Sequence, residues 1–292
     1  MWIGITLYIS IFAIFNLGKG SGGWFADEND LSLYLNTQLP FFFSLFLIEN
    51  KFWKRALYIA TALASLIAEV ISFSRGGFVG LAAMFVFMIL FSKKKILTLI
   101  FVSLIGIGVF YYGGEAYRNE METITETQSG TAQARLQYWK AAWRMFIDNP
   151  FGVGGNNFQV RFPEYQSDWF GRGMWGRVAH SLWFTLIPEL GIFGIFIYFS
   201  LLFHNIKDLL MLRSMETGGD SDLKFLSMIA TATLVSLAGF FTSAAFLSVL
   251  YYPFYWYLTA LIVSLCRVSS IIKTTNEMKD SNLAINESHS LV

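Results

Sequence analysis

The chain has 292 residues, of which 55% are hydrophobic and only 14% charged, whereas a soluble domain usually carries about 25% charged residues. The apolar content excludes a disordered chain, and a net charge of +1 lacks the basic excess typical of nucleic-acid binding. The one cysteine, Cys266, permits neither an intrachain disulfide nor a cysteine-based zinc site. With a mean hydropathy of +0.51, the composition indicates a polytopic membrane protein.

Eight apolar runs have the length of helices that cross the hydrocarbon core of a bilayer. The strands of a β-barrel would be shorter and would alternate in polarity, which these runs do not. We therefore expect an all-α integral membrane protein of about eight transmembrane helices. The expected spans are residues 2–17, 31–48, 56–73, 77–91, 96–112, 182–203, 225–247 and 251–266.

Lysine and arginine in the short connections predict the orientation, because cytoplasmic loops of membrane proteins are enriched in both residues. The connections after the second, fourth and sixth spans are rich in them, whereas the short connections on the other side hold only Lys19 and Arg75. Both termini are thus expected in the cytoplasm. The domain plan is five spans in 1–112, a long extracytoplasmic loop in 113–180, three spans in 181–267 and a polar cytoplasmic tail in 268–292.

The long loop contains an expected amphipathic helix near residues 131–148. Leu136, Trp139, Trp143 and Phe146 recur at spacings of three and four, which places them on one apolar face. The Asn-Pro pair at 149–150 ends the helix. A helix of this kind is suited to lie among lipid headgroups with its tryptophans at the interface.

Several polar side chains stand out at or near the expected outer face, and each also has an ordinary structural explanation. Arg75 lies between two spans with almost no connecting loop, where it could simply be a snorkelling arginine. Arg135 could be a charge on a solvated helix face, and His180 an interfacial histidine. Glu69 and Glu189 lie within spans, where a carboxylate is functional by default, and both a hydrogen-bonded structural role and a substrate role remain open.

The motifs of metal and nucleotide sites are missing from the sequence. The acidic stretch 27–30 lacks the spaced oxygen ligands and the glycine of a calcium-binding EF-hand loop. The sequence contains no Gly-Lys-Ser/Thr phosphate loop, so ATP-driven transport is not indicated. We therefore expect neither a metal nor another cofactor.

Five motifs occur in order on the expected outer face: Ser-Arg-Gly-Gly (74–77), Ala-Arg-Leu-Gln-Tyr-Trp (134–139), Asn-Pro-Phe-Gly-Val-Gly (149–154), Ala-His-Ser (179–181) and Glu-Leu-Gly-Ile-Phe-Gly (189–194). In this order and spacing they resemble the O-antigen ligase and polymerase family of bacterial membranes, especially its O-glycosylation ligase branch. Members of that family usually have additional spans before the part seen here. The chain is therefore expected to be a form that lacks the first spans.

The resemblance implies a metal-independent glycosyltransferase of lipopolysaccharide or polysaccharide biosynthesis. It would move a glycan from an undecaprenyl-type polyprenyl diphosphate to a lipid, glycan or protein hydroxyl, on the periplasmic or outer face of the bacterial inner membrane. A polymerase that adds repeat units to a lipid-linked chain is the alternative. A transporter of lipid-linked glycans without chemistry is a third reading, although its charged residues would lie near the bilayer midplane.

The resemblance also assigns roles to residues at matching positions. His180 would be the general base, because an imidazole with a pKa of about 6.5 can take a hydroxyl proton at neutral pH. Arg75 and Arg135 would grip the diphosphate in place of a metal, because guanidinium groups bind phosphate oxygens in pairs and stabilise developing negative charge. Further substrate contacts are expected from Arg161, Tyr165, Arg172, Arg177 and Glu189.

The orientation can be tested by one-sided labelling. We predict that Lys93, Lys94 and Lys95 face the cytoplasm and that Gly130 and Asp168 face outside. Single cysteines at Lys95 and Asp168, in a chain that carries Cys266→Ser, are exposed to an impermeant maleimide in intact cells and then in opened cells. The cysteine at position 168 should react before the cells are opened, and a reaction there only from the cytoplasmic side would contradict the orientation.

Overall fold

The computed structural model describes residues 1–25, 27–92, 95–112, 130–171, 173–215 and 217–290, and within these ranges it contains helices and no strand. Lys93, Lys94, Arg172 and the loop residues 113–129 therefore lie outside the described part of the chain. The expected all-α fold is confirmed for the described residues. The elements, in order, are α1 (Trp2–Phe15), the 3-10 helix η1 (Gly23–Phe25), α2 (Glu28–Ile48), α3 (Phe52–Ile71), α4 (Arg75–Phe91), α5 (Lys95–Tyr112), α7 (Gly130–Asp148), α8 (Phe158–Tyr165), the 3-10 helix η3 (Asp168–Phe170), α9 (Leu182–Ser214), α10 (Ser221–Ala244) and α11 (Pro253–Ser290).

Each of the eight apolar runs coincides with a helix, namely α1 to α5 and α9 to α11. Within the described residues, α2, α9, α10 and the Pro253–Met278 part of α11 are long and apolar enough to cross a membrane. The helices α1 and α4 are apolar but shorter. Eight crossings, the extracytoplasmic loop and the domain plan stay predictions.

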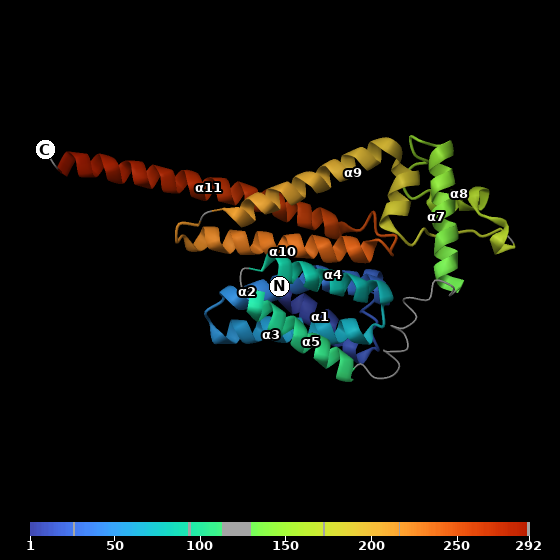
Figure 1. The fold of residues 1–292 in the computed structure, drawn as a ribbon, viewed down its shortest axis with the longest axis horizontal. Coiled ribbons are helices and arrows are strands. Elements are labelled where there is room, and N and C mark those ends of the chain that lie inside the picture. Colours follow the sequence, from blue (N-terminus) through green and yellow to red (C-terminus); the bar gives the residue numbers. More distant parts are fainter. Residues whose placement is uncertain (26, 93–94, 113–129, 172, 216, 291–292) are drawn as a thin grey trace.

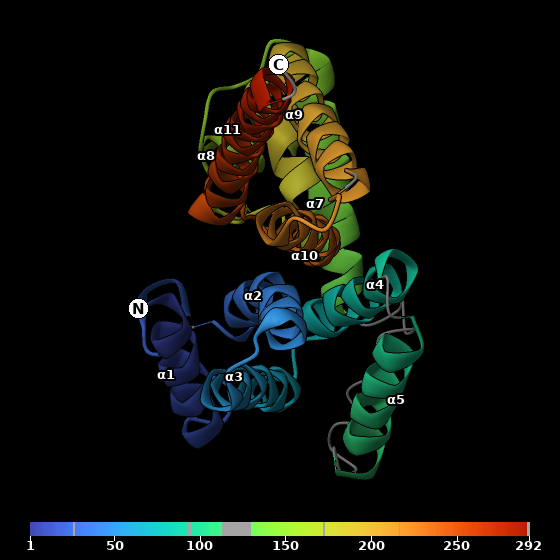
Figure 2. The ribbon, with the colours of Figure 1, turned by 90° about the vertical axis from the view of Figure 1, so that its left-hand side faces the viewer.

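Helix α10 lies at the centre of the bundle and contacts α2, α4, α9 and α11 (Figures 1 and 2). Buried polar side chains join these helices. The Asn36 amide of α2 donates to the Gly77 carbonyl of α4 at 2.8 Å and to the Ser243 hydroxyl of α10 at 3.3 Å. Because lipid offers no hydrogen bonds to such groups, they must be satisfied between helices. These bonds hold the first turn of α4 against α2 and α10.

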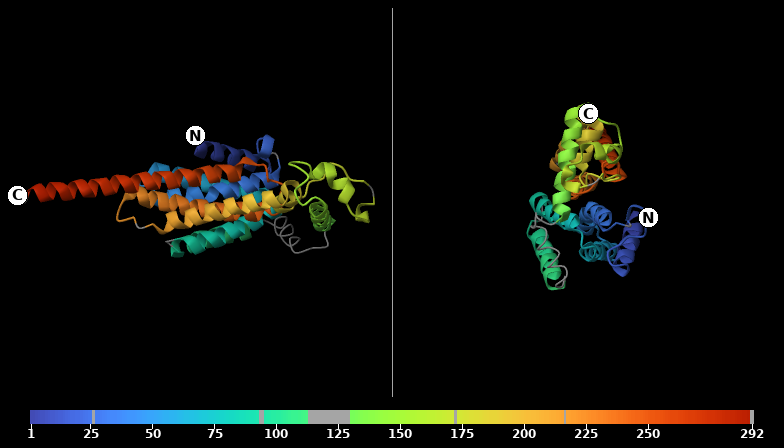
Figure 3. Two further views of the ribbon diagram at one scale, coloured as in Figure 1. Left: turned by 90° about the horizontal axis from the view of Figure 1, so that it is seen from above. Right: turned by 90° about the vertical axis from the view of Figure 1, so that its right-hand side faces the viewer.

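The two ends of the bundle are formed by different helices and connections. Helices α7 and α8 gather at one end, where α7 runs across the direction of α9, α10 and α11 (Figures 1 and 3). The connections from α2 to α3 and from α9 to α10 lie at the opposite end, together with the far end of α11 (Figure 1). We call the end with α7 and α8 the loop end. The connections rich in lysine and arginine thus lie away from it, as the predicted orientation requires.

The expected amphipathic helix is present as α7, and it has a packed side in addition to the predicted apolar face. The buried side is formed by Tyr138, Ala141, Ala142 and Met145, which join Phe158 and Phe162 of α8 in a small separate core. Leu136 and Trp143 of the predicted face are exposed, and Trp139 stacks on Phe184 with ring centroids 4.9 Å apart. The helix therefore has one apolar side packed within the loop and a second one open to the surroundings.

A break in α9 attaches the loop to the bundle. Gly191 has φ 61° and ψ −163°, a conformation that is essentially restricted to glycine. The Pro188 and Glu189 carbonyls, released by the break, accept hydrogen bonds from the Val153 and Gly154 amides at 2.9 and 3.0 Å, and Ile192 N–H donates to the Pro150 carbonyl at 2.9 Å. The motif at 149–154 therefore completes the backbone hydrogen bonds of the broken helix.

We predict that Gly191→Ala destabilises the protein. The new methyl group would meet the backbone carbon of Phe151, and the backbone conformation alone costs on the order of 1–3 kcal/mol for a residue other than glycine. Thermal unfolding of the purified protein in detergent measures the effect. Gly4→Ala is the matched control, because its methyl group would meet nothing within 4 Å; equal midpoints for the two variants would refute the role of the break.

Candidate functional site

The first turns of α2 and α4 are tied together at the loop end. Asp27 caps α2 by accepting the Asn29 amide at 2.8 Å, and Ser74 caps α4 by accepting the Gly77 amide at 2.9 Å. The Ser74 hydroxyl in turn donates to the Asn29 side-chain oxygen at 2.8 Å. Arg75, which is half-buried, is the first residue of α4 and is therefore fixed next to the start of α2.

His180 directly precedes Ser181, the capping residue of α9, and its backbone is strained. Its φ of 49° lies in the left-handed region, which residues other than glycine rarely adopt. Two hydrogen bonds fix this turn: His180 N–H donates to Ser248 Oγ at 2.9 Å, and the Trp139 indole donates to the Ala179 carbonyl at 3.0 Å. The imidazole also lies against the Tyr138 ring, with centroids 5.9 Å apart.

The effect of one charged side chain on the pKa of another indicates that the two lie close together, because electrostatic interactions weaken with distance. Burial lowers the pKa of His180 below its usual value, and the positive charge of Arg135 lowers it further. Asp27 raises and Arg177 lowers the same pKa by smaller amounts. Burial also lowers the pKa of Arg135, and the charge of Arg75 adds to this effect. The fold therefore places Arg135 near both Arg75 and His180, and it places Asp27 and Arg177 near His180.

The arrangement combines a neutral base with fixed cations. A lowered pKa keeps the His180 imidazole uncharged at neutral pH, so it can accept a proton. Arg75 and Arg135 remain charged, because no ordinary pKa shift neutralises a guanidinium. Helices α2, α4 and α9 also begin at this end, and helix N-termini favour anions. The group is suited to hold an anionic leaving group beside a hydroxyl that is losing its proton.

Arg75, Arg135 and His180 all lie within the range of the chain that matches a known protein family. A family model described as O-antigen ligase matches residues 39–199, more than half of the chain. The chain belongs to the O-antigen ligase family. No curated protein sequence matches it. Membership supports a membrane protein of O-antigen ligase or polymerase type, with glycosyl transfer from lipid-linked glycans as the activity of the family.

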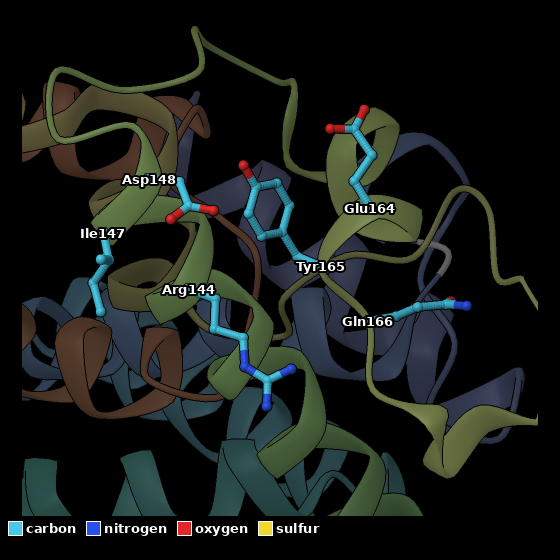
Figure 4. A pocket seen from close by; sticks show the side chains of 6 residues that line it. All are labelled: Arg144, Ile147, Asp148, Glu164, Tyr165 and Gln166. Carbon is cyan, nitrogen blue, oxygen red and sulfur yellow. The ribbon is translucent and has the colours of Figure 1, made fainter.

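The matched range also contains Arg161 and Tyr165. These two residues lie on α8 and not with Arg75, Arg135 and His180. Arg161 pairs with Glu164 at 2.8 Å on α8. The Tyr165 hydroxyl accepts a hydrogen bond from Asn149 at 2.9 Å. Tyr165 lines a hollow of about 320 Å³ between the end of α7 and α8 (Figure 4), together with Arg144, Ile147, Asp148, Glu164 and Gln166. Neither the arginine pair nor His180 belongs to this lining.

The Glu189 side chain is bonded within the chain. The residue is only 3% exposed, and its carboxylate accepts the Asn156 and Phe158 amides at 2.8 and 2.9 Å. The Tyr251 hydroxyl donates to the same carboxylate at 2.5 Å. With these three donors in place, the side chain fixes the start of α8, which favours the structural alternative for this residue over a substrate contact.

Two residues near His180 were not expected from the sequence. Asp27 stood out only as part of an acidic stretch with the wrong spacing for a metal, and Ser248 not at all. Ser248 lies 68 positions after His180 and beyond the residues that the ligase family model matches. No local pattern could have connected either residue to the histidine, because only the packing of α2 and α10 brings them there. Among the described residues, no group of three or more His, Cys, Asp or Glu side chains has the arrangement of a metal site.

We predict that Arg75→Lys lowers glycan transfer about tenfold or more. Lysine keeps the charge but loses the planar fork that binds two phosphate oxygens, and a lost transition-state donor costs at least this much. Arg144→Lys is the matched control, since Arg144 is exposed near the C-terminal end of α7, whereas Arg135 lies near the start of that helix. Turnover per inserted molecule is compared for the two variants. Equal turnover would favour a snorkelling arginine at position 75.

Proposed function

We propose that this member of the O-antigen ligase family transfers a glycan from a polyprenyl diphosphate to an acceptor hydroxyl on the outer face of the bacterial inner membrane. The observation that carries the proposal is the juxtaposition of Arg75, Arg135 and a neutral His180 at the loop end. The donor is already activated by its diphosphate, so the reaction needs no nucleotide and no other cofactor.

The proposed step is a displacement at the anomeric carbon of the glycan. His180 accepts the proton of the acceptor hydroxyl while the acceptor oxygen forms its bond to that carbon. The bond from the carbon to the diphosphate oxygen breaks, and its electron pair leaves with the lipid diphosphate. Arg75 and Arg135 stabilise the charge that grows on this leaving group, which makes them the proposed substitute for a divalent metal.

Further substrate contacts are proposed in two places. Arg177 is exposed and its charge reaches His180, so it is suited to the diphosphate or to an acidic sugar. Arg161 and Tyr165 lie on α8 and would meet sugars farther from the reacting carbon. Arg172 remains a proposed contact from its sequence position alone.

The placement of charges disfavours a transporter. The arginines and His180 gather where helices begin at the loop end, whereas a transporter holds its substrate near the bilayer midplane. Transporters also use broken helices to bind substrates, but the carbonyls released by the break in α9 are bonded to the amides of residues 153 and 154. A polymerase would use the same residues with a sugar hydroxyl of a lipid-linked chain as acceptor.

We predict that His180→Ala lowers turnover by roughly 10²–10⁴-fold, the usual contribution of a placed acid–base group. The pH at which wild-type turnover falls to half should lie below the ordinary histidine pKa of about 6.5, because burial and Arg135 lower the pKa of His180. Mass spectrometry of the product, from purified protein, lipid-linked glycan and acceptor in EDTA, measures transfer. Donor binding is measured separately and should change little.

His204→Ala is the matched control, because that histidine is exposed on α9 and bonds to the Ser200 carbonyl of its own helix at 2.7 Å. It should behave like the wild type. A His180→Ala protein that transfers glycan at a near-native rate would contradict the role of His180 as the base. Activity that is lost in EDTA and restored by Mg²⁺ would refute the proposal that arginines replace a divalent metal.

A further inference from the structure

The segment between α10 and α11, residues 245–252, contacts three parts of the loop end. Ser248 accepts the His180 amide at 2.9 Å. Tyr251 donates to Glu189, which holds the start of α8. Tyr252 donates to Asp30 in the first turn of α2 at 2.9 Å. Three side chains of one short segment thus bond to the turn before α9, to Glu189 within α9 and to the first turn of α2.

The segment is itself held firmly, so it can act as a fixed support. Leu247, Val249 and Leu250 are buried in the main core. The segment also forms turns of its own, with Val249 N–H donating to the Leu247 carbonyl and Tyr252 N–H to the Val249 carbonyl, both at 3.0 Å. Ser248 lies between the buried residues and points its hydroxyl oxygen at the His180 amide.

The His180 amide needs such a partner. It directly precedes the first turn of α9, where backbone amides have no acceptor within the helix. Its left-handed conformation is strained and persists only where the surroundings determine it. The bond to Ser248 is the one that holds the histidine's own backbone, whereas Trp139 holds the preceding residue.

We propose that Ser248 is a positioning residue that holds His180 in the left-handed turn from which its imidazole reaches the acceptor hydroxyl. The proposal rests on the role of His180 given above. If the turn relaxes, the ring moves relative to the groups that face it: Arg135 and the Tyr138 ring from α7, Asp27 from the start of α2, and Arg177 from the segment before α9. Because burial and Arg135 hold the pKa of the ring low, such a movement should raise it toward about 6.5.

The test compares three variants. Ser248→Ala removes the acceptor, and Ser248→Thr keeps a hydroxyl at the same position. Ser264→Ala removes an exposed hydroxyl that donates to the Ala260 carbonyl of its own helix. Turnover and KM for lipid-linked glycan are measured per inserted molecule across pH. The imidazole pKa is measured by NMR on protein with isotope-labelled histidine, in which His180→Gln identifies one signal among three histidines.

Ser248→Ala should lower kcat about 10- to 100-fold, as expected for a misplaced catalytic group. It should change KM little and raise the pKa of His180. Ser248→Thr should restore both readouts, and Ser264→Ala should match the wild type. Unchanged kcat and pKa in Ser248→Ala would overturn the proposal, as would equal losses in Ser248→Ala and Ser248→Thr.

The NMR readout separates this proposal from the proposed function. A pKa of His180 that moves in Ser248→Ala, while kcat and its pH profile stay native, would show that the contact holds the imidazole but that the imidazole is not the base. In that case the proposed role of His180 as the base fails, and the contact between Ser248 and His180 stands.

Discussion

The hydrogen bonds between residues 150–154 and the break in α9 are the constraint on which the site depends. They attach the loop to the bundle at the break in α9, which follows His180 in the chain. There the Val153 and Gly154 amides donate to the Pro188 and Glu189 carbonyls. Helix α7 ends just before this attachment and α8 begins just after it. The direction of α7 across the bundle, and therefore the place of Arg135, follows from it. Glu189 strengthens the attachment by holding two amides at the start of α8.

The site brings cations and a strained backbone into one place. Arg135 is half-buried near another guanidinium, and His180 has a strained backbone beside that cation. Asp27 affects the pKa of His180 in the opposite direction. In the proposed reaction an anionic diphosphate would meet cations that the fold holds in place before the leaving group develops its charge. Strain and like charges at one place are typical of sites that are built for binding.

The spans could be predicted from sequence because apolar length is a local property. Every expected run coincides with a helix to within a few residues at its start, and the extent of α7 was also right. The side of α7 that packs inside the loop, formed by Tyr138, Ala141, Ala142 and Met145, was not predicted, whereas Trp143 of the predicted apolar face is exposed. Two apolar sides of one helix look alike in sequence, and only the position of α8 decides which one packs inside the loop.

The same limit explains what could be predicted of the site. Arg75, Arg135 and His180 were identified because they sit in motifs, and the fold brings them together. Asp27 and Ser248 reach His180 from α2 and from the segment after α10, so their proximity depends on the whole bundle. Arg161 and Glu189 are polar residues in the matched range whose partners within the chain, Glu164 and the start of α8, became visible only in three dimensions.

The second apolar side of α7 bears on how a membrane-bound donor would reach this site. Leu136, Trp143 and Ile147 are exposed on a helix that crosses the end of the bundle (Figure 1), and apolar and tryptophan side chains in such a helix favour the headgroup region. Arg135 lies next to Leu136 on the same helix. If α7 lies in the headgroup region, the Arg135 guanidinium lies at the same depth as the diphosphate of a lipid-linked donor. The polyprenyl chain of that donor then stays in the hydrocarbon. The donor would then need no extraction from the bilayer, and the acceptor hydroxyl could approach His180 from the aqueous side.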